Sequence, residues 1–504
     1  MLKLLDRLID SLTMYRLLLY YLIGLLLAAM ILGQFGHLPY KPLNILLTSL
    51  VLLAACWVTN KAFALIFKAP TNHESSLITA LILSLIISPT GSGISFLLAV
   101  SGLAMASKYL LTINRKHLFN PAAIAVTLTA LGPQQSASWW VGTAAMLPYV
   151  LVGGVLMVRK VRRWPMVGSF LGSAIVANAL YTLLSGGSLI PSSKALVLSS
   201  ALCFLSFVML TEPLTSPTTS RKQVWYGLLV GVLFPPQAHL LSLYSTPERA
   251  LTLGNLFAYM ISPKTKLFPV LRQKSKIATD SAEFVFDPKE KFAYEPGQYM
   301  EWTLPHKGTD ARGNRRYFTL ASSPTEPDIR LGIKFYPKGS SYKQAMLAMT
   351  AETPIVAGQI AGDFVLPKDA GQKLAFIAGG IGITPFRSMI KYLIDRDEKR
   401  DIVMLYSARA STDLAYQEIF EESRRKLGLK TIYTLTSENA NLPNKYCRSG
   451  YITADLIKTE IPDYQERMFY LSGTHAMVAA MQETLTSLGV HYSRVKVDFF
   501  PGYA

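Results

Sequence analysis

RRYFTLASSP, residues 315–324, is the segment from which the organisation of the chain is most readily understood. Its composition predicts a β-strand in which the cation Arg316 stands three residues before the hydroxyl of Thr319, with the aromatic residues Tyr317 and Phe318 between them. Groups of these kinds bind a flavin dinucleotide: a guanidinium for the pyrophosphate, a flat ring against the isoalloxazine and a hydroxyl near its N5 edge. Because any surface strand can show so short a pattern, its meaning depends on the sequence around it.

Residues 264–367 read as short alternating strands separated by turn residues. The strands are expected at 275–286, 298–304, 316–322, 328–336 and 354–365. This rhythm is typical of a small antiparallel β-barrel. Gly339, Ser340 and Ser341 lie beyond the central strand, and small residues with accessible amides are suited to hold phosphate oxygens.

Residues 368–504 show a different pattern, in which buried-strand runs alternate with helices as in a doubly wound α/β domain. A buried-strand run at 374–378 leads into GGIGITP, residues 379–385, and then into a helix expected at 386–395. A strand, a glycine turn and a helix present backbone amides and a positive helix end to a pyrophosphate, and glycine permits the close approach. Further strands are expected at 402–407, 431–435, 468–471 and 495–499.

The amino-terminal half has a different composition. Half of the 504 residues are hydrophobic and only 16% are charged, and residues 15–263 are almost all apolar runs broken by short polar links. Three of the apolar segments, 76–88, 119–132 and 250–263, are shorter than the roughly 20 residues of a straight membrane span, so we expect half-helices or helices packed inside a bundle there. The ten apolar segments lie at 15–33, 43–59, 76–88, 93–112, 119–132, 138–158, 164–184, 195–212, 223–240 and 250–263.

Basic residues predict the topology, because they concentrate in cytoplasmic loops. With the amino terminus in the cytoplasm, the outer loops carry only Lys41, Lys194 and Arg249. The inner loops carry Lys61, Lys68, Arg115, Lys116, Arg159, Lys160, Arg162, Arg163, Arg221 and Lys222. A bilayer therefore explains the net charge of +18 without a nucleic-acid partner. We expect a multi-pass plasma-membrane protein whose amino terminus and carboxyl-terminal half are cytoplasmic.

A weak internal repeat predicts two inverted five-helix halves. Ser75-Ser76 opens an apolar run that ends at Pro89 in the third segment. Ser199-Ser200 opens a run of the same length that ends at Pro213 in the eighth segment. Inverted repeats usually enclose a site near the midplane of the membrane. Asn120 and Asn255, placed at the starts of the fifth and tenth segments, are candidate counterparts.

The cysteines of the chain and the histidines of the amino-terminal half leave few sites for a metal. Cys56, Cys203 and Cys447 are too far apart for a disulfide framework, a four-cysteine zinc site or a one-chain iron–sulfur cluster. A haem needs two facing axial ligands, and no segment carries a spaced pair among His37, His73, His117 and His239. No metal site is assigned. Glu212, near a span end, either contacts an ion or a flavin or is a solvated loop residue.

Two motifs of the amino-terminal half carry a family resemblance: FNPA at 119–122 and MLTEPLTSPTT at 209–219. Residues 15–265 resemble the D subunit of Rnf electron-transport complexes and the B subunit of the sodium-pumping NADH:quinone reductase. The resemblance implies ten helices, a membrane-bound flavin and redox-driven ion transport. Those subunits attach FMN through a threonine, which the link between Gly132 and Ser138 lacks, so no covalent FMN is assigned and a non-covalent second flavin stays open.

The carboxyl-terminal half is similar to the ferredoxin–NADP reductase family over residues 265–504. The shared order is Pro-Gly-Gln at 296–298, the Arg-x-aromatic-Thr strand, Gly-x-Ser at 339–341, GGIGITP, YSAR at 406–409, LSGT at 471–474 and DFFPGY at 498–503. The resemblance implies that Arg316 would hold the FAD pyrophosphate, Phe318 would pack on the isoalloxazine and Thr319 would approach N5. Gly380, Gly382 and Thr384 would line the nicotinamide nucleotide.

The resemblance also implies the remaining site residues. Phe318 stands where the family has tyrosine, and Ser472-Gly473-Thr474 stands where it has Cys-Gly-Pro. Catalytic roles are expected for Thr319, Ser472 and Phe499. Phe499 or Phe500 would cover the flavin, although both, with Tyr503, could instead seal the core, and Arg409 either contacts the adenosine phosphate or is solvated. The expected cofactor-binding residues are Arg316, Tyr317, Phe318, Thr319, Gly339, Ser340, Ser341, Gly379, Gly380, Gly382, Thr384, Pro385, Arg409, Gly473 and Phe500.

The sequence thus predicts three domains: a transmembrane domain (1–263), an FAD-binding barrel (264–367) and an NAD(P)-binding domain (368–504). We expect an enzyme in which NAD(P)H reduces FAD, and electrons then reach a membrane or trans-membrane acceptor, either a quinone or an electron-transfer protein. One alternative is a component that transports Na⁺ or H⁺, against which stands the lack of an acidic pair inside any expected span. A haem-bearing ferric reductase is the other alternative, disfavoured by the histidines.

Overall fold

The computed structural model describes residues 12–67, 73–113, 116–132, 136–198, 201–240, 243–262, 266–310, 313–337, 339–437 and 446–500. The chain divides into two compact units, Met1–Thr265 and Lys266–Ala504, and each is described by itself. Several residues named above lie outside the described residues: Lys68, Arg115, Ser199, Ser200 and Tyr503.

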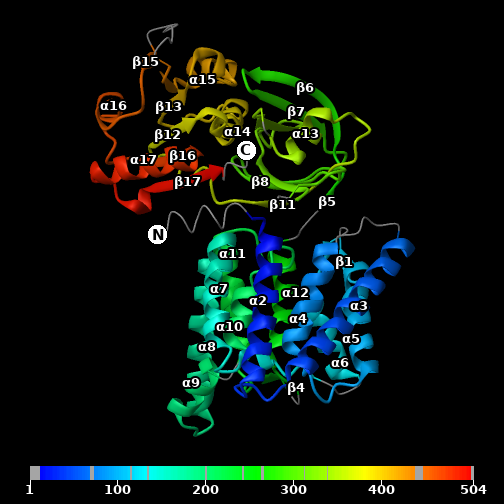
Figure 1. Ribbon diagram of the computed structural model, residues 1–504. Helices are drawn as coiled ribbons and strands as arrows, with labels where there is room; N and C mark the ends of the chain where they lie inside the picture. The colour runs from blue at the N-terminus through cyan, green and yellow to red at the C-terminus, as the bar shows by residue number, and fades with distance from the viewer. Residues whose placement is uncertain are drawn as a thin grey trace. The chain divides into compact units, whose positions relative to one another are not determined.

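The first unit is helical, and every apolar segment expected from the sequence contains a helix (Figure 1). Among the described residues, α2, α3 and α8 are long and apolar enough to cross a membrane, and a fourth span results if α9 and the 202–209 helix, bent by 52°, count as one. The helices are α2 (Met14–Gln34), α3 (Pro42–Ile66), α4 (His73–Ile86), α5 (Ile94–Leu110), α6 (Pro121–Leu131), α7 (Leu147–Val161), α8 (Trp164–Leu184), α9 (Leu189–Leu198), α10 (Leu202–Phe204) continued by the π-helical η2 (Leu205–Met209), α11 (Ser220–Leu233) and α12 (Pro247–Ile261).

The helices α6 and α12 are capped in the same way at their amino termini. Asn120 caps α6 by accepting from the amide of Ala123 at 3.1 Å, and Thr246 caps α12 by accepting from the amide of Arg249. Each cap is followed by a proline, whose fixed φ suits the first helical position. The expectation that Asn255 begins its helix is therefore wrong: Asn255 lies in the middle of α12, and the residue that caps α12 is Thr246.

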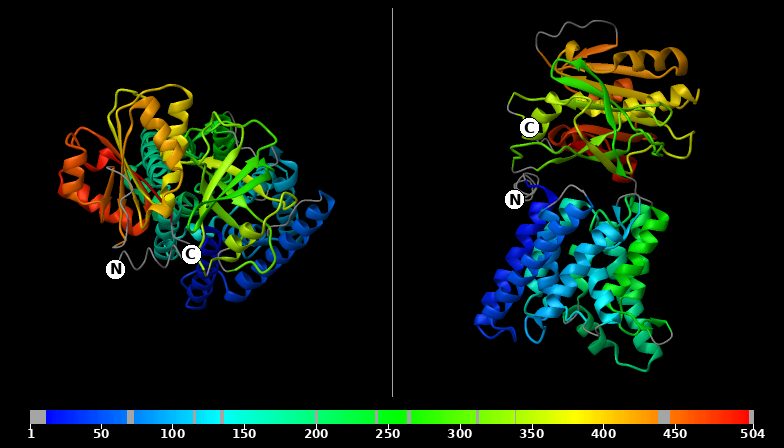
Figure 2. Two further views of the ribbon diagram at one scale, coloured as in Figure 1. Left: turned by 90° about the horizontal axis from the view of Figure 1, so that it is seen from above. Right: turned by 90° about the vertical axis from the view of Figure 1, so that its right-hand side faces the viewer.

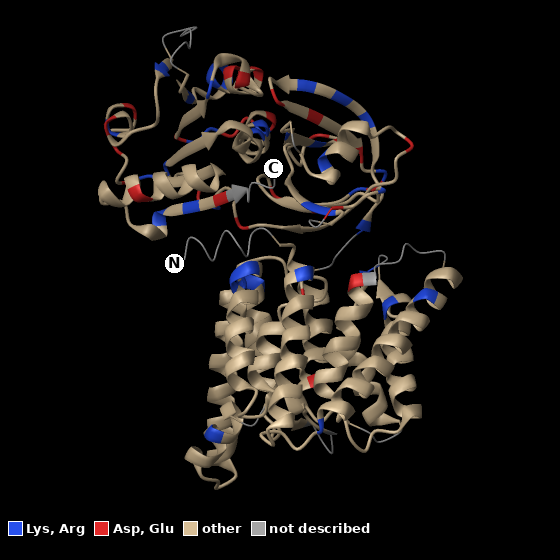
Figure 3. Ribbon diagram, in the orientation of Figure 1, with Lys and Arg blue, Asp and Glu red and all other residues tan. Residues whose placement is uncertain are grey.

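The two halves of the helical unit pack their helices in the same order. The helix α3 packs on α4 and α5, and α8 packs on α9 and α11. Likewise α6 follows and contacts α5, and α12 follows and contacts α11. The contact of α11 with α8 is close because Gly227 and Gly231 face it: a Cβ at either position would lie 2.5 Å from a carbonyl oxygen of α8. Figure 3 shows basic residues gathered at the end of this unit that holds the first turn of α2 and the last turn of α7.

The second unit begins with two antiparallel sheets, with strand orders β10-β7-β6 and β5-β11-β8-β9. Trp302, Phe284, Phe286 and Tyr342 fill the core between them. The single strand expected at 275–286 is instead a hairpin, in which Ala278 pairs with Ser281 across a turn that no glycine announces. The elements are β5 (Lys266–Leu267), β6 (Val270–Ala278), β7 (Ser281–Asp287), β8 (Tyr299–Thr303), β9 (Arg315–Thr319), β10 (Ile329–Lys334), α13 (Ser341–Ala348) and β11 (Val356–Ala361).

The unit continues as a six-stranded parallel sheet in the order β15-β14-β13-β12-β16-β17, which confirms the predicted doubly wound domain. Helices α14 and α15 cover one face of the sheet and α16 and α17 the other (Figure 2). An apolar cluster lies under each pair of helices. The strand β15 was not expected. The elements are β12 (Leu374–Gly379), α14 (Thr384–Asp395), β13 (Ile402–Ala408), α15 (Gln417–Leu427), β14 (Lys430–Leu435), β15 (Cys447–Ser449), α16 (Ala454–Glu460), β16 (Met468–Thr474), α17 (His475–Ser487) and β17 (Val495–Phe500).

Candidate functional site

The strand β9 places Arg316 and Phe318 on one face. Arg316 is 8% exposed, and its guanidinium lies 5.0 Å from the centre of the Tyr342 ring. The ring of Phe318 lies 6.0 Å from the same ring. Tyr317 points to the other face, where its hydroxyl donates to Glu301 Oε2 at 2.9 Å, because side chains alternate along a strand. The structure therefore does not bring Tyr317 to the face that Arg316 and Phe318 share.

The first turn of α13 lies beside Arg316, because Tyr342 belongs to it. Ser340, which follows Gly339, caps this helix by accepting from the amide of Lys343. The amide of Ser341 donates to Asp310 Oδ2 at 3.0 Å, so a carboxylate already occupies one donor at this helix end. An anion at a helix start is stabilised by the free amides and by the helix dipole. A guanidinium and a helix amino terminus side by side suit a pyrophosphate, and the sequence had not pointed to Tyr342 or Asp310.

The GGIGITP loop connects β12 to α14 where β12 meets β16. Gly380 has a φ of +54°, a left-handed conformation that favours glycine. A Cβ on Gly382 would lie 2.5 Å from the carbonyl oxygen of Ser472, and one on Gly379 would overlap the sulfur of Met477. Thr384 starts α14 and donates to the carbonyl of Ile381 at 3.2 Å, with Pro385 behind it. The glycines thus hold the loop tightly against the end of β16.

Ser472 presents an unusual hydroxyl at this edge of the sheet. The residue is fully buried in β16, next to Ala378 of β12, and its Oγ has no hydrogen-bond partner among the described residues. A buried hydroxyl without a partner costs free energy, so such groups usually await a ligand or a solvent molecule. Ligands of doubly wound sheets bind at the carboxyl ends of the strands, which is where Ser472 and Gly473 lie. The residues present therefore fit a nucleotide at this edge.

The remaining expected residues are placed as follows. Thr319 ends β9, opposite Tyr299, and is 4% exposed. Arg409 follows β13 at the same sheet edge as Ser472, and it is exposed. Phe499 and Phe500 belong to β17, and their backbones pair with those of Gly473 and Thr474 in β16. The structure does not describe the side chains of these two phenylalanines.

Glu212 of the helical unit is held by hydrogen bonds, which disfavours the solvated-loop alternative. Its Oε2 accepts from Asn120 Nδ2 at 2.8 Å and from Thr215 Oγ1 at 3.0 Å, and its side chain is 24% exposed. The backbone amide of Asn120 donates to Asn255 Oδ1 at 2.8 Å. Asn120 and Asn255 therefore meet, although Asn120 caps a helix and Asn255 lies in the middle of one.

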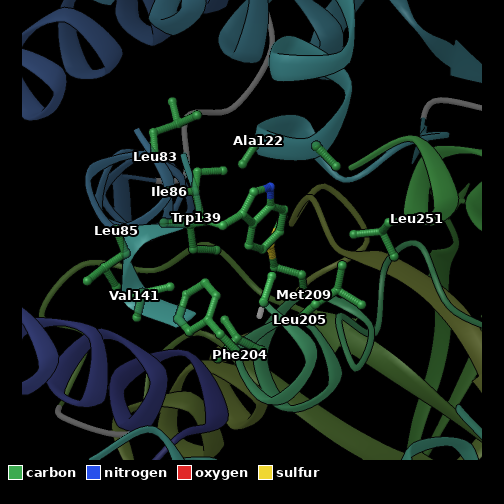
Figure 4. Packing of buried hydrophobic residues seen from close by; sticks show 14 of the residues in the cluster. Leu83, Leu85, Ile86, Ala122, Trp139, Val141, Phe204, Leu205, Met209 and Leu251 are labelled. Carbon is green, nitrogen blue, oxygen red and sulfur yellow. The ribbon is translucent and has the colours of Figure 1, made fainter. Parts of the chain in front are cut away.

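Glu248, which the sequence analysis missed, is buried in the first turn of α12 with 1% exposure. Its Oε2 accepts from the indole of Trp139 at 2.9 Å. Figure 4 shows Trp139 among apolar side chains that include Leu83, Ile86 and Met209. The lack of an acidic pair inside the expected spans therefore counts less against ion transport, because the cap Thr246-Pro247 starts α12 before the expected segment and places Glu248 in its first turn.

A polar seam runs between these two carboxylates along the contact of α6 with α12. We define this α6–α12 seam as Glu248, Thr252, Thr127, Asn255, Asn120 and Glu212. The hydroxyls of Thr127 and Thr252 lie 3.3 Å apart in its middle. Polar groups buried inside a membrane bundle are expensive and usually functional. Among the described residues, no three His, Cys, Asp or Glu side chains lie close enough together to hold a metal ion.

Fold and site together define a nucleotide-binding module of oxidoreductase type joined to a helical membrane unit. Residues 376–483 match the family model described as the oxidoreductase NAD-binding domain, and residues 135–263 match that of the NQR2, RnfD, RnfE family. Both resemblances expected from the sequence are thereby confirmed.

Curated relatives match less than half of the chain. The flavohemoprotein of Bacillus cereus is 29% identical over 217 residues, which cover 41% of this chain and 53% of that protein. The glycine betaine monooxygenase reductase subunit of Chromohalobacter salexigens is 24% identical over 221 residues, 43% of this chain and 59% of that protein. The chain thus spans about half the length of the curated relatives it matches. The crystal structure of the Amycolatopsis cytochrome P450 reductase GcoB is 23% identical, with a TM-score of 0.42, and the match covers 48% of this chain and 72% of that one.

Proposed function

We propose that this protein is a membrane-bound FAD-dependent NAD(P)H oxidoreductase. The observation that carries the proposal is the pair of nucleotide-binding features within one unit: Arg316 against the start of α13, and the buried hydroxyl of Ser472 against the GGIGITP loop. The match of residues 376–483 to an oxidoreductase domain supports it. The three domains are taken as residues 1–263, 264–367 and 368–504.

The chain's own residues divide the work of binding and orientation. Arg316 and the amides at Gly339, Ser340 and Ser341 hold the FAD pyrophosphate, and Asp310 gives up the Ser341 amide when the anion binds. Phe318 packs on the flavin ring, and Thr319 offers its hydroxyl to the ring edge from the end of the strand, where the alternation of β9 stops. FAD supplies the ability to accept two electrons from NAD(P)H and to release them singly.

NAD(P)H, which donates the electrons, binds at the edge of the parallel sheet where the carboxyl ends of β12 and β16 lie. Gly380, Gly382 and Thr384 line it, and Ser472 donates its hydrogen bond to the nicotinamide group, which would satisfy the buried Oγ. Arg409 contacts the adenosine phosphate from the exposed end of β13. Phe499 or Phe500 covers the flavin face where nicotinamide docks.

The membrane setting completes the proposal. The unit of apolar helices spans the plasma membrane several times, with the basic end and the reductase unit cytoplasmic. The electron acceptor is a quinone or an electron-transfer partner protein reached through the membrane unit, and a second, non-covalent flavin in that unit would serve as a relay.

The test is a count of bound cofactors and their reduction. Protein purified in mild detergent should be yellow, release FAD on denaturation and bleach under nitrogen when NADH or NADPH is added. Protein that carries no flavin and does not take up added FAD would refute the proposal. A Soret band in the same spectrum would favour the haem-bearing ferric reductase instead.

A second candidate function, redox-driven transport of Na⁺ or H⁺, is favoured by the α6–α12 seam. The seam joins two acidic groups across a bundle whose halves pack in the same order, which supports two inverted five-helix halves and a site between them. Proteoliposomes given NADH and quinone should then build a membrane potential. Electron transfer without a potential would leave only the reductase.

A further inference from the structure

A buried ion pair joins the segment after β9 to the first turn of α14. The guanidinium of Arg387 pairs with both carboxylate oxygens of Glu326, and its Nη2–Oε1 distance is 2.9 Å. The side chains are 5% and 11% exposed. Arg387 Nη1 also donates to the carbonyl of Ala321 at 3.0 Å. Arg387 lies three residues after Thr384 of the nucleotide loop, and Ala321 lies two residues after Thr319 of the flavin strand.

Further contacts hold the same segment, residues 320–326, from α14 on one side and from β10 and β7 on the other. Ser388 Oγ donates to the carbonyl of Ser322 at 2.5 Å, next to the Arg387 contact. Glu326 accepts from the amide of Ser323 at 2.7 Å and lies 3.3 Å from Arg330 Nε, and Arg330 in turn pairs with Glu283 of β7 at 2.9 Å. The ion pair is thus one link in a chain of charges between the antiparallel sheets and the parallel-sheet domain.

A close approach of the backbone accompanies the ion pair. Gly332 of β10 faces α14, and a Cβ there would lie 2.7 Å from Thr384 Cγ2 and 2.8 Å from the hydroxyl of Tyr416. The ring of Tyr416 lies 5.6 Å from the guanidinium of Arg387. The antiparallel sheets and the parallel-sheet domain therefore meet at Thr384 itself. They have little room to slide against each other, because a packed interior has few voids.

We propose that Arg387 and Glu326 are positioning residues that set the spacing between the flavin edge at Thr319 and the nicotinamide loop at Gly379–Thr384. The inference rests on the proposed function. In the proposed reaction, a hydride with both its electrons would pass from nicotinamide C4 to flavin N5, so that the nucleotide would be oxidised and the flavin reduced. The two atoms must approach to about 3–3.5 Å, and a misplacement of about 1 Å can cost on the order of 100-fold in rate. Arg387 makes two contacts with Glu326 and a third with the carbonyl of Ala321. Together these contacts restrict both the distance and the orientation of α14 relative to the segment after β9, which an apolar contact does not.

The experiment compares Arg387→Met, the double variant Arg387→Met/Glu326→Leu and the control Arg467→Met in the full-length protein. Replacing a buried pair by apolar residues often preserves stability, whereas removing one partner leaves a buried charge. Arg467 is a matched control because it is equally buried, pairs twice with Asp463 and donates to a backbone carbonyl, that of Leu374, at the start of β12. Readouts are flavin content, melting temperature and the rate of flavin bleaching by saturating NADH in anaerobic stopped flow.

We expect both Arg387 variants to lose about 10- to 100-fold in the bleaching rate at saturating NADH, with the double variant recovering stability but not rate. In flavin-free protein, hydrogen exchange across residues 320–326 should accelerate in Arg387→Met and not in Arg467→Met. A double variant that recovers both stability and rate would overturn the inference, as would an equal loss of rate in Arg467→Met. If the wild type itself is not bleached, the proposed function fails and the inference with it; if wild type and Arg387→Met bleach equally fast, only the inference fails.

Discussion

Replacing Arg316 by methionine tests the flavin site most directly. Methionine keeps an apolar stem of similar length against Tyr342 but removes the guanidinium that lies 5.0 Å from its ring centre. If Arg316 contacts the FAD pyrophosphate, the loss of one charge-assisted contact costs roughly 1.5–3 kcal/mol. That corresponds to an increase of about 10- to 100-fold in the Kd for FAD.

The structure also predicts a cost to stability for this variant. Arg316 donates to the carbonyls of Gly313 and Arg315, and its stacking on Tyr342 contributes about 0.5–2 kcal/mol. Arg316→Lys, which keeps the charge but loses the planar fork, should bind FAD with intermediate affinity. The assay is a fluorescence titration of flavin-free protein with FAD, with circular dichroism to show that each variant is folded.

Arg315→Met is the matched control, because Arg315 points to the opposite face and lies 3.6 Å from Glu301 at a partly exposed site. Such a pair contributes about 0–1 kcal/mol, so the Kd for FAD should change little. Equal FAD affinity in the wild type and Arg316→Met, or a larger loss in Arg315→Met, would refute the placement of the pyrophosphate.

Three further predictions follow from particular side chains. Ser472→Ala should raise the melting temperature of nucleotide-free protein, because a buried hydroxyl without a partner is removed, yet raise the KM for NADH; a lower melting temperature with an unchanged KM would contradict this assignment. Glu248→Gln should abolish the membrane potential of proteoliposomes while flavin reduction continues, and a normal potential would exclude the α6–α12 seam as an ion path. Hydrogen bonds from Arg467 hold the pKa of Asp463 below its ordinary value, so this carboxylate stabilises the fold above about pH 3.9 and loses that effect as the pH falls through the lower folded pKa. The melting temperature of Asp463→Asn should therefore fall less steeply below pH 4 than that of the wild type.

The sequence alone was sufficient for the features that depend on neighbouring residues. The apolar runs predicted where the helices of the first unit lie, because a bilayer and a packed bundle both select continuous hydrophobic segments. GGIGITP predicted the strand, turn and helix around Gly380, because a positive φ and a close backbone contact both require glycine. Alternation along β9 correctly separated Arg316 from Arg315.

Boundaries without a strong local signal were harder to predict. The turn between β6 and β7 contains neither glycine nor proline, so one long strand was expected in place of a hairpin. The start of α12 was placed too late, because the polar residues Thr246 and Glu248 look like loop residues although they form the cap and the first turn. This error concealed Glu248 and misplaced Asn255.

Contacts between distant parts of the chain came only from the folded structure. Arg387 and Glu326 are 61 residues apart, Asn120 and Asn255 are 135 apart, and Trp139 and Glu248 are 109 apart. Each contact arises because burial of the surrounding apolar surface brings the two segments together, and a buried polar group must then find a partner wherever the fold leaves one. Local pattern therefore predicted which chemical groups the chain offers, and packing determined which of them meet.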